Sequence, residues 1–279
     1  MVSTTKLIRK SALYLVVAVG AFLTVSPFLW MLLSSFKNST EIFSYPPTIL
    51  PNIWRMDNYS KLFIERPFGT WYLNSILIAA IGTVAVLFFS SLAGFAFAKY
   101  NFKGRGVMFG VLLGSTMIPF QLILVPLFIE VSRFKMIDTY AGLIIPFMAP
   151  AVGIFLMKQF CSSIPDELLD AARIDGASEF GIYVHVVLPL LRPAMGTLGI
   201  ITFLGSWNSF VWPLVILRTE SMMTLPIGLR ALTENVPGKE RDYGMIMAAA
   251  SLVSILVVAV FLAMQKQFVA GLLSGAVKQ

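Results

Sequence analysis

Long apolar runs separated by short polar segments dominate the chain. Six runs are each close to the roughly 20 residues that a helix needs to cross the hydrocarbon core of a bilayer. They cover residues 11–36, 71–98, 106–129, 139–157, 194–217 and 244–264, and none contains Asp, Glu, Lys or Arg. The runs are continuous instead of alternating, which favours helices over barrel strands. The pattern therefore predicts an all-α integral membrane protein with six transmembrane helices.

The composition excludes most soluble classes of protein. Of the 279 residues, 57% are hydrophobic and 13% are charged, whereas soluble domains have about 25% charged residues. An ordinary cytosolic enzyme, a disordered tail and a disulfide scaffold are therefore excluded. The single cysteine, Cys161, and the single histidine, His185, leave no Cys/His cluster for a metal. We expect no metal site, and a membrane enzyme is a poor alternative because no run holds a carboxylate.

The basic residues predict the orientation in the membrane. They flank the apolar runs instead of forming a patch interleaved with aromatic residues, so the net charge of +7 does not indicate a nucleic-acid partner. Three lie in residues 1–10 and three more in the short segment 99–105. Because Lys and Arg mark cytoplasmic loops, and short loops and the first span weigh most, we expect both termini in the cytoplasm. The predicted organisation is an N-terminal segment 1–10, a membrane domain 11–264 and a C-terminal tail 265–279.

Two longer loops, 37–70 and 218–243, then lie outside. The first carries Pro46, Pro47 and Pro51. Because proline fixes φ and disfavours helix, we expect an extended cap in this loop.

The loop 158–192, between the fourth and fifth runs, is the most informative polar segment. It holds five carboxylates and three basic residues: Asp166, Glu167, Asp170, Asp175 and Glu179, with Lys158, Arg173 and Arg192. A hairpin lying on the lipid headgroups is one interpretation, but such helices usually carry Lys and Arg on the polar face. A protein partner fits the acidic composition better.

The pattern within this loop predicts a helix–turn–helix. Ser163 and the acid three residues later match a capping box, with Pro165 in the first turn. An apolar stripe recurs at helical spacing, at Ile164, Leu168, Ala171 and Ala172. Gly176 suits the left-handed residue that ends a helix. A second helix is expected from Ser178 until Pro189 ends it.

These residues closely resemble the EAA loop of bacterial ABC-importer permeases. The resemblance rests on residues 164–168 (IPDEL), residues 170–177 (DAARIDGA), Leu188-Pro189 and Pro193, at the matching place before the last two spans. The wider chain resembles the carbohydrate-uptake branch, the maltose-permease G-type subunits. Supporting stretches are Asn74-Ser75, Met117-Ile118-Pro119, Trp207-Asn208, Trp212-Pro213 and the tail 268–278. The chain departs from the family pattern at Asp170, where Glu is usual, and at His185, where Arg or Lys is common.

The resemblance implies the type I permease fold of an ABC importer in the bacterial inner membrane. The loop would then be a coupling helix that docks on a cytoplasmic ATPase dimer. The implied coupling residues are Glu167, Asp170, Ala171, Ala172, Asp175, Gly176, Ala177, Leu188 and Pro189. The chain has no P-loop, so no cofactor is expected in it, and ATP and Mg would be bound by the ATPase. Further implied partners are a second permease subunit, forming a heterodimer, an extracytoplasmic solute-binding protein and membrane lipid.

The resemblance also implies a carbohydrate as the solute, with a polyol or glycerol phosphate as alternatives. Candidate pathway residues are the polar and aromatic groups within the runs: Gln121, Trp207, Asn208, Phe210 and Trp212, with Ser206 and Ser209 nearby. Amides at such depth face a cavity or another helix, so packing between helices explains these residues equally well. An ion-coupled carrier is the less favoured alternative, since carriers usually place ionisable groups at membrane depth.

Overall fold

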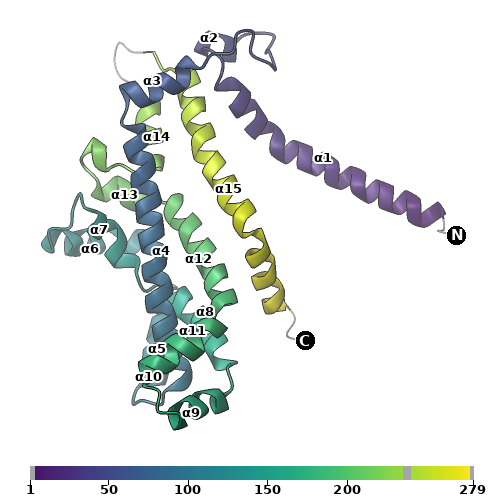
Figure 1. The fold of residues 1–279 in the computed structure, drawn as a ribbon. Helices are drawn as coiled ribbons and strands as arrows, with labels where there is room; N and C mark the ends of the chain where they lie inside the picture. Colours follow the sequence, from purple (N-terminus) through teal and green to yellow (C-terminus); the bar gives the residue numbers. More distant parts are fainter. Residues whose placement is uncertain (1–3, 235–239, 277–279) are drawn as a thin grey trace. The chain divides into compact units, whose positions relative to one another are not determined.

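The computed structural model describes residues 4–234 and 240–276, the side chains of 4–8 and 263–276 excepted. All regular elements in these residues are helical (Figure 1), as the apolar pattern predicts. Contacts divide the chain into two compact units. One is formed by Met1–Phe68 with Leu229–Val257, and the other by Gly69–Gly228 with Val258–Gln279.

The first unit contains α1 (Thr4–Ser34), α2 (Ser39–Ile42), α3 (Asp57–Glu65) and the beginning of α15 (Tyr243–Ala276). The three prolines of the loop 37–70 lie in the non-helical segment 43–56, as the fixed φ of proline predicts. The extended cap is therefore shorter than expected, because α2 and α3 form on either side of it.

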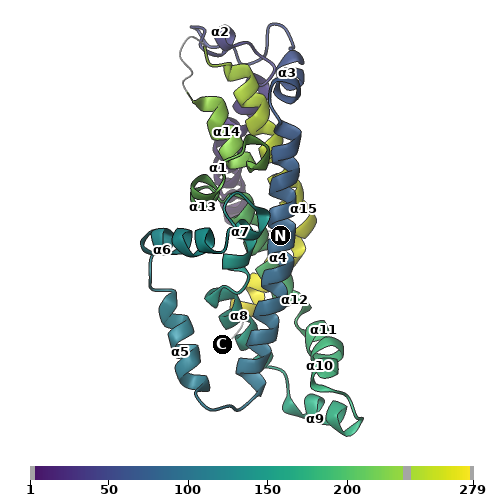
Figure 2. The ribbon, with the colours of Figure 1, turned by 90° about the vertical axis from the view of Figure 1, so that its left-hand side faces the viewer.

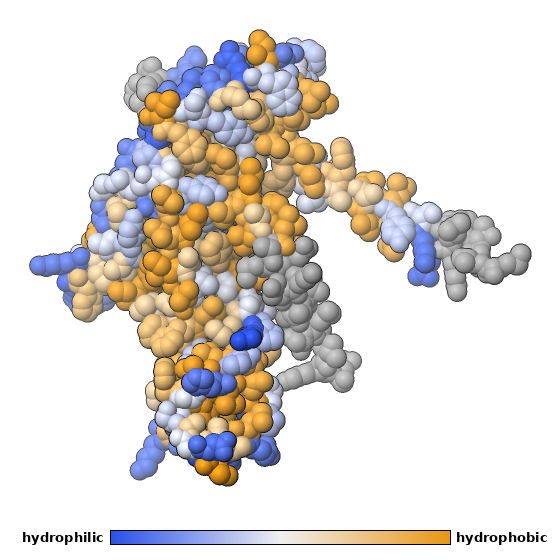
Figure 3. Space-filling view, in the orientation of Figure 1, coloured by the Kyte–Doolittle hydropathy of each residue, from blue (hydrophilic) through white to orange (hydrophobic). Residues whose placement is uncertain are grey.

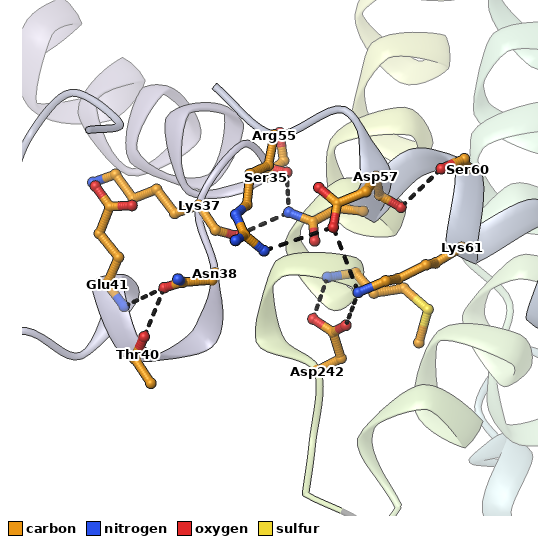
Figure 4. Close-up of polar contacts among 12 residues, drawn as sticks. Ser35, Lys37, Asn38, Thr40, Glu41, Arg55, Asp57, Ser60, Lys61 and Asp242 are labelled. Carbon is orange, nitrogen blue, oxygen red and sulfur yellow. Dashed lines mark hydrogen bonds and ion pairs between the residues drawn. The ribbon is translucent and has the colours of Figure 1, made fainter. Parts of the chain in front are cut away.

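Polar contacts join the loop around α2 and α3 to the start of α15 (Figure 4). The amide of Asn58 donates to the carbonyls of Ser35 and Lys37, at 2.7 and 2.8 Å. The ammonium of Lys61 lies 3.7 Å from the carboxylate of Asp242, immediately before α15. The two hydrogen bonds from Asn58 satisfy backbone carbonyls that would otherwise lack partners after the end of α1.

In the part of the chain that the structure describes, three helices are long and apolar enough to cross a membrane unbroken. They are Arg9–Ser34 within α1, Phe68–Lys99 (α4) and Tyr243–Leu262 within α15, and they match the predicted runs 11–36, 71–98 and 244–264. The backbone of α15 stays helical through Ala276, into the predicted tail 265–279, whose side chains lie outside the described residues.

The predicted run 106–129 is not one helix. Instead, α5 (Arg105–Ser115) and α6 (Phe120–Arg133) are bent by 105° at a short break, and Figure 2 shows α6 turning sharply away from α5. Pro119 immediately precedes α6. Because a residue before proline is pushed out of helical backbone geometry, Ile118 disfavours a continuous helix and the chain turns there.

The run 139–157 is also bent. The helix formed by α7 (Tyr140–Ile144) and the 3₁₀ turn η1 (Ile145–Phe147) makes an angle of 46° with α8 (Ala151–Ser162), whose N-cap is Pro150. Proline suits the start of a helix and interrupts its interior, which explains the bend.

The run 194–217 is corrected in the same way. The helix α12 (Arg192–Trp207) ends at Asn208, and α13 (Val211–Ile216) follows after a break. In one continuous helix, Pro213 would remove a hydrogen bond and clash with the preceding turn. In α13 it lies in the first turn, where its missing N–H needs no partner.

Among the described residues, the helices long and apolar enough to cross a membrane therefore number three, or up to six when each bent pair is taken as one span. The third bent pair joins Glu179–Leu190 to Arg192–Trp207 at 79°. Within the second unit, apolar side chains cover the flank of α4 and α12, and hydrophilic and hydrophobic side chains are intermixed at the end where α9 lies (Figure 3).

One buried apolar cluster in the second unit holds the loop 158–192 against the long helices. It comprises Val86, Phe95, Met157, Cys161, Ile164, Leu169, Ile182, Tyr183, Val187, Leu191, Ala194 and Leu198. The cluster draws on α4, α8, α12 and the intervening loop, so burial of apolar area fixes that loop to the membrane helices.

Part of the loop 218–243 is docked on the other end of α4. The indole Nε1 of Trp71 donates to the carbonyl of Glu220 at 2.9 Å, and the amide of Asn74 donates to the carbonyls of Ser221 and Met223. These side chains hold residues 220–223, which include the 3₁₀ turn η3 (Glu220–Met222), against α4.

Candidate functional site: a helical hairpin and a neighbouring cavity

The loop 158–192 folds as a hairpin of two short helical arms. The first arm is α9 (Asp166–Ile174). The second is α10 (Glu179–Ile182), continued by the π-helical turn η2 (Tyr183–Val187) and α11 (Leu188–Leu190). Both ribbon views place this hairpin at the C-terminal end of α4 (Figures 1 and 2). The predicted helix–turn–helix is therefore present.

The start of α9 differs from the prediction. Pro165 is the N-cap, and no side chain caps the helix there. The hydroxyl of Ser163 instead donates to the carbonyl of Phe160, at the end of α8. The capping box is therefore wrong: Ser163 is occupied by the preceding helix, which ends one residue before it.

The turn between the arms confirms the prediction for Gly176. Its φ is +79°, a left-handed conformation, and its N–H donates to the carbonyl of Arg173 at 3.0 Å. The N–H of Ala177 donates to the carbonyl of Ala172, also at 3.0 Å. This pair of bonds is the Schellman motif that ends helices at glycine. A Cβ at Gly176 would meet nothing within 4 Å, so only the backbone conformation disfavours other residues.

The buried face of α9 is not the predicted stripe. Leu169 is 1% exposed and packs in the apolar cluster together with Ala172, whereas Leu168 is 47% exposed and Ala171 is also exposed. Ile164 is buried as expected. The stripe fails at Leu168 and Ala171 because the chain turns at Pro165, so Ile164 does not share the register of α9.

An apolar surface on the hairpin is consequently left uncovered by the described residues. It consists of Leu168, Ala171, Ile174 and Phe180, of which Ile174 is 87% and Phe180 61% exposed. The implied coupling residues Glu167, Asp175 and Ala177 are also exposed. We call these seven residues the exposed hairpin face. A polar protein surface seldom presents such residues together unless something binds them.

Charged side chains brace the two arms against each other. Arg173 on α9 donates to Asp170 at 2.7 Å and to Glu179 on α10 at 2.9 and 3.2 Å. Glu179 also accepts a hydrogen bond from the hydroxyl of Tyr100. Hydrogen bonds from Arg173, and secondly from Tyr100, lower the pKa of Glu179. Asp170, which we expected to contact a partner, is therefore also part of the internal bracing, although it stays 63% exposed.

The second arm corrects the expectation for Pro189. The helical run continues past this proline to Leu190, because the preceding turn widens to π geometry and the N–H of Leu188 bonds to the carbonyl of Tyr183. Widening is one way to accommodate a residue that lacks a donor. Leu188 packs on the apolar cluster, Pro189 is exposed, and the imidazole Nδ1 of His185 lies 3.0 Å from the carbonyl of Gly181.

A cavity of about 530 Å³ lies among α4, α7, α8, α12 and α13 of the second unit. None of its lining residues is charged. Of the predicted pathway residues, Phe210 and Trp212 line it, while Gln121, Trp207 and Asn208 do not. Polar lining is supplied by four hydroxyl side chains, those of Thr202, Ser206, Ser209 and Thr224.

The two tryptophans differ in their surroundings. Trp212 is fixed by a hydrogen bond from its indole nitrogen to the carbonyl of Gly142 at 3.0 Å. Trp207 is 1% exposed and lies between Phe203 and Tyr72, with ring centroids 6.2 and 5.7 Å away. Contact of these side chains with a solute stays a prediction. Thr202 and Thr224 were not anticipated, because Thr202 is one of many small polar residues in an apolar run and Thr224 lies outside every run.

The family model described as "Binding-protein-dependent transport system inner membrane component" matches residues 87–273. The chain belongs to this family. It is 37% identical to the arabinooligosaccharides transport system permease protein AraQ of Bacillus subtilis, over 97% of this chain and 96% of that protein. It is 31% identical to the lactose transport system permease protein LacG of Rhizobium radiobacter, with 95% of each covered. The sn-glycerol-3-phosphate transport system permease protein UgpE of Yersinia enterocolitica is 32% identical, over 93% of this chain and 94% of that protein.

A solved structure shares the fold. It is described as a bacterial ABC transporter involved in the import of the acidic polysaccharide alginate, and one of its chains superposes with a TM-score of 0.86 at 23% identity, covering 96% of this chain and 99% of that chain. These findings confirm the permease fold and a multi-pass membrane protein of a transport system. As a family member, the chain is a transport component and not a catalytic enzyme.

Proposed function

We propose that this chain is one permease subunit of an ATP-driven importer, and that the exposed hairpin face is the surface that a separate cytoplasmic ATPase binds. The main observation in support is that the hairpin has a firmly packed interior but an exposed apolar outer face. Its interior is fixed by the apolar cluster, Arg173 and the Gly176 turn. Its outer face nevertheless presents Leu168 and Ile174, which none of the described residues covers. Such a stiff projection with an apolar tip suits docking into another protein.

The remaining partners follow from the same proposal. A solute-binding protein delivers solute outside, a second permease completes the pathway, and an ATPase dimer binds ATP and Mg. Both termini then lie in the cytoplasm, on the side of the hairpin. The six apolar runs contain no charged residue, whereas ion-coupled carriers usually use ionisable groups within the membrane. This supports an importer whose energy comes from an ATPase outside the membrane, and disfavours an ion-coupled carrier.

We further propose a neutral saccharide as the solute. The named relatives handle arabinooligosaccharides, lactose and sn-glycerol-3-phosphate. The cavity lining offers hydroxyl groups and the rings of Phe210 and Trp212, but no Lys or Arg. A phosphate group buried there would have no opposite charge to offset its lost hydration. An uncharged sugar, which bonds through hydroxyls and stacks on aromatic rings, suits this lining better than a glycerol phosphate.

Two isoleucines of similar exposure test the docking surface. Ile174 is 87% exposed on α9 and Ile64 is 82% exposed on α3. A photoreactive phenylalanine derivative is introduced at each position in turn, and membranes containing the complete transporter are irradiated. We expect covalent attachment of the ATPase subunit at position 174 and none at position 64. Attachment at 64 alone, or at neither position in an assembled complex, would contradict the proposal.

Reconstituted uptake separates the importer from the alternative carrier. Proteoliposomes containing the complete complex are given labelled arabinotriose with the solute-binding protein, and either ATP inside or an ion gradient alone. We expect accumulation only with ATP. Uptake that survives on a sodium or proton gradient without ATP would favour the carrier.

A further inference from the structure

The C-terminal end of α4 contacts both arms of the hairpin through one face. Ser91, Phe95 and Lys99 are spaced four residues apart and therefore share a side of the helix. The hydroxyls of Ser91 and Tyr183 lie 2.7 Å apart, and the ring of Phe95 stacks on that of Tyr183 with centroids 6.0 Å apart. The second arm is thus fixed to α4 by side chains that are distant from it in sequence.

Lys99 fixes the beginning of the first arm. Its side chain is only 7% exposed, and its ammonium donates to the carboxylate of Asp166 at 2.6 Å and to the carbonyl of Ile164. A buried ammonium is costly unless its donors are satisfied, and here both acceptors come from the junction where α8 leads into α9. Lys99 therefore holds the entry to the hairpin in one position relative to α4.

Tyr100, the next residue, connects to the beginning of the second arm. Its hydroxyl donates to Glu179, the first residue of α10. Glu179 in turn accepts two hydrogen bonds from Arg173 of α9. One chain of hydrogen bonds therefore runs from the end of α4 through the second arm to the first.

The same helix also forms part of the cavity wall. Ile78, Gly82 and Val86 of α4 line the cavity, and the helix continues without interruption to Lys99. Lys99 follows Val86 by 13 positions, which correspond to about 20 Å of helix at 1.5 Å per residue. A continuous helix of this length moves as a stiff element.

We propose that Lys99 and Tyr100 are positioning residues that fasten the hairpin to α4, so that displacement of the hairpin moves the cavity wall with it. The inference rests on the proposed docking of an ATPase on the exposed hairpin face, and adds the route by which that movement enters the membrane. The route passes across side-chain contacts into α4, in addition to the chain connections through α8 and α12. Neither residue contacts the cavity or belongs to the exposed hairpin face.

Coupling of uptake to hydrolysis provides the first readout. The substitutions Lys99→Met and Tyr100→Phe each remove the polar link and keep most of the apolar stem or ring. In the reconstituted complex, each is expected to lower the arabinotriose moved per ATP hydrolysed by about tenfold, within the range of common coupling energies. Lys99→Arg should restore most of this ratio. Lys103→Met, an exposed lysine of the same connection, is the matched control and should match the unsubstituted protein.

A distance measurement tests the fastening without any solute. Nitroxide labels at Ile81 on α4 and Leu190 on α11, both about half exposed, report the separation of the helix and the hairpin in the full complex. We expect the same narrow distance distribution in the nucleotide-free and the vanadate-trapped states. In the variant carrying both Lys99→Met and Tyr100→Phe, the distribution should broaden or shift on trapping.

The outcomes separate this inference from the proposed function. A shift of several ångströms on trapping in the unsubstituted complex would show that the hairpin moves independently of α4, and would overturn the inference. An unchanged ratio of arabinotriose moved to ATP hydrolysed in both variants would also overturn it. So would variants whose only defect is weaker assembly with the ATPase. Absence of any ATPase bound to the unsubstituted chain would instead overturn the proposed function.

Discussion

Arg173 and Glu179 bind each other across the hairpin turn through two parallel hydrogen bonds, of 2.9 and 3.2 Å. A planar guanidinium suits this two-point contact with a carboxylate, and an ammonium does not. The Arg173→Lys variant keeps the charge and loses the geometry. We expect faster hydrogen exchange of the amides of residues 166–182 in this variant, measured by mass spectrometry on the purified complex.

The matched control for that experiment is Arg133→Lys. Arg133 pairs with Glu130 at 2.8 Å on the exposed surface of α6, three residues away on the same helix. Exposed pairs of this kind contribute little, so exchange in α6 should not change. Equal exchange in the Arg173→Lys variant and the unsubstituted protein would show that the pair does not brace the hairpin.

The same contacts predict how the hairpin responds to pH. The pKa of Glu179 is lowered, chiefly by Arg173, so its contribution to stability is present above the ordinary glutamate value of 4.5 and is lost as the pH falls through the lowered pKa. Burial, and then the bond to Glu179, raise the pKa of Tyr100 to about 12. Its contribution is therefore present below the ordinary value of 10.0 and is lost as the pH rises towards about 12.

The measurement compares the thermal unfolding midpoints of the unsubstituted chain, Glu179→Gln and Tyr100→Phe from pH 4 to pH 11. The difference between the unsubstituted chain and each variant should be flat near neutral pH. It should shrink for Glu179→Gln at the acidic end and for Tyr100→Phe at the alkaline end. A difference that changes between pH 6 and pH 8 would contradict this assignment of the two groups.

Gly176 offers a test of backbone conformation free of steric crowding. Its φ of +79° disfavours β-branched residues, whereas asparagine tolerates this region. Because a Cβ would meet no atom within 4 Å, strain is the only cost. We expect Gly176→Val to lower uptake strongly and Gly176→Asn to retain most of it, at equal amounts of protein in the membrane. An equal loss of uptake in both variants would show that glycine is required here for a reason other than its backbone conformation.

Gly228 tests the opposite situation, in which space is the limit. A Cβ there would lie 2.2 Å from Cε3 of Trp71, so Gly228→Ala must displace the indole that donates to the carbonyl of Glu220. Overpacking of this kind costs about 1–3 kcal/mol, and we expect a lower unfolding midpoint in detergent. Gly110→Ala is the control, because nothing lies within 4 Å of its position. A Gly228→Ala variant as stable as the unsubstituted chain would show that the Trp71 contact yields easily.

Local patterns in the sequence predict where the helices of this protein lie, but they predict less well where an apolar run is broken into two helices. Hydrophobic length locates α1, α4 and α15, because a continuous apolar run has one stable form in lipid. The breaks beside Pro119 and Pro213 were missed because proline is tolerated within membrane helices. Whether it kinks or ends one depends on tertiary contacts that the run itself does not encode.

The hairpin shows the same division between local and tertiary information. Gly176 was identified correctly because its left-handed turn depends only on neighbouring residues. The buried face of α9 was misassigned because the chain changes register at Pro165 and turns Leu169 inwards in place of Leu168. The contacts from Lys99 and Tyr100 join residues more than 60 positions apart, and no single-sequence pattern specifies them.

Thr224 lines the cavity, and we expect its replacement to raise the stability of the chain and to weaken transport. Its hydroxyl is buried at the cavity wall, and none of the described residues gives it a hydrogen bond. An unpaired buried hydroxyl is destabilising, so the near-isosteric Thr224→Val should raise the free energy of unfolding by about 1 kcal/mol. If that hydroxyl bonds to a passing sugar, the same variant should require about fivefold more arabinotriose for half-maximal uptake.

Thr83 provides the control for Thr224. Its hydroxyl is also buried and without a hydrogen-bond partner among the described residues, but it does not line the cavity. Thr83→Val should therefore stabilise the chain to a similar extent and leave the uptake curve unchanged. A Thr224→Val variant that gains stability and transports normally would remove this hydroxyl from the pathway. The solute would then be recognised at Ser206, Ser209 or Thr202, or chiefly by the partner permease.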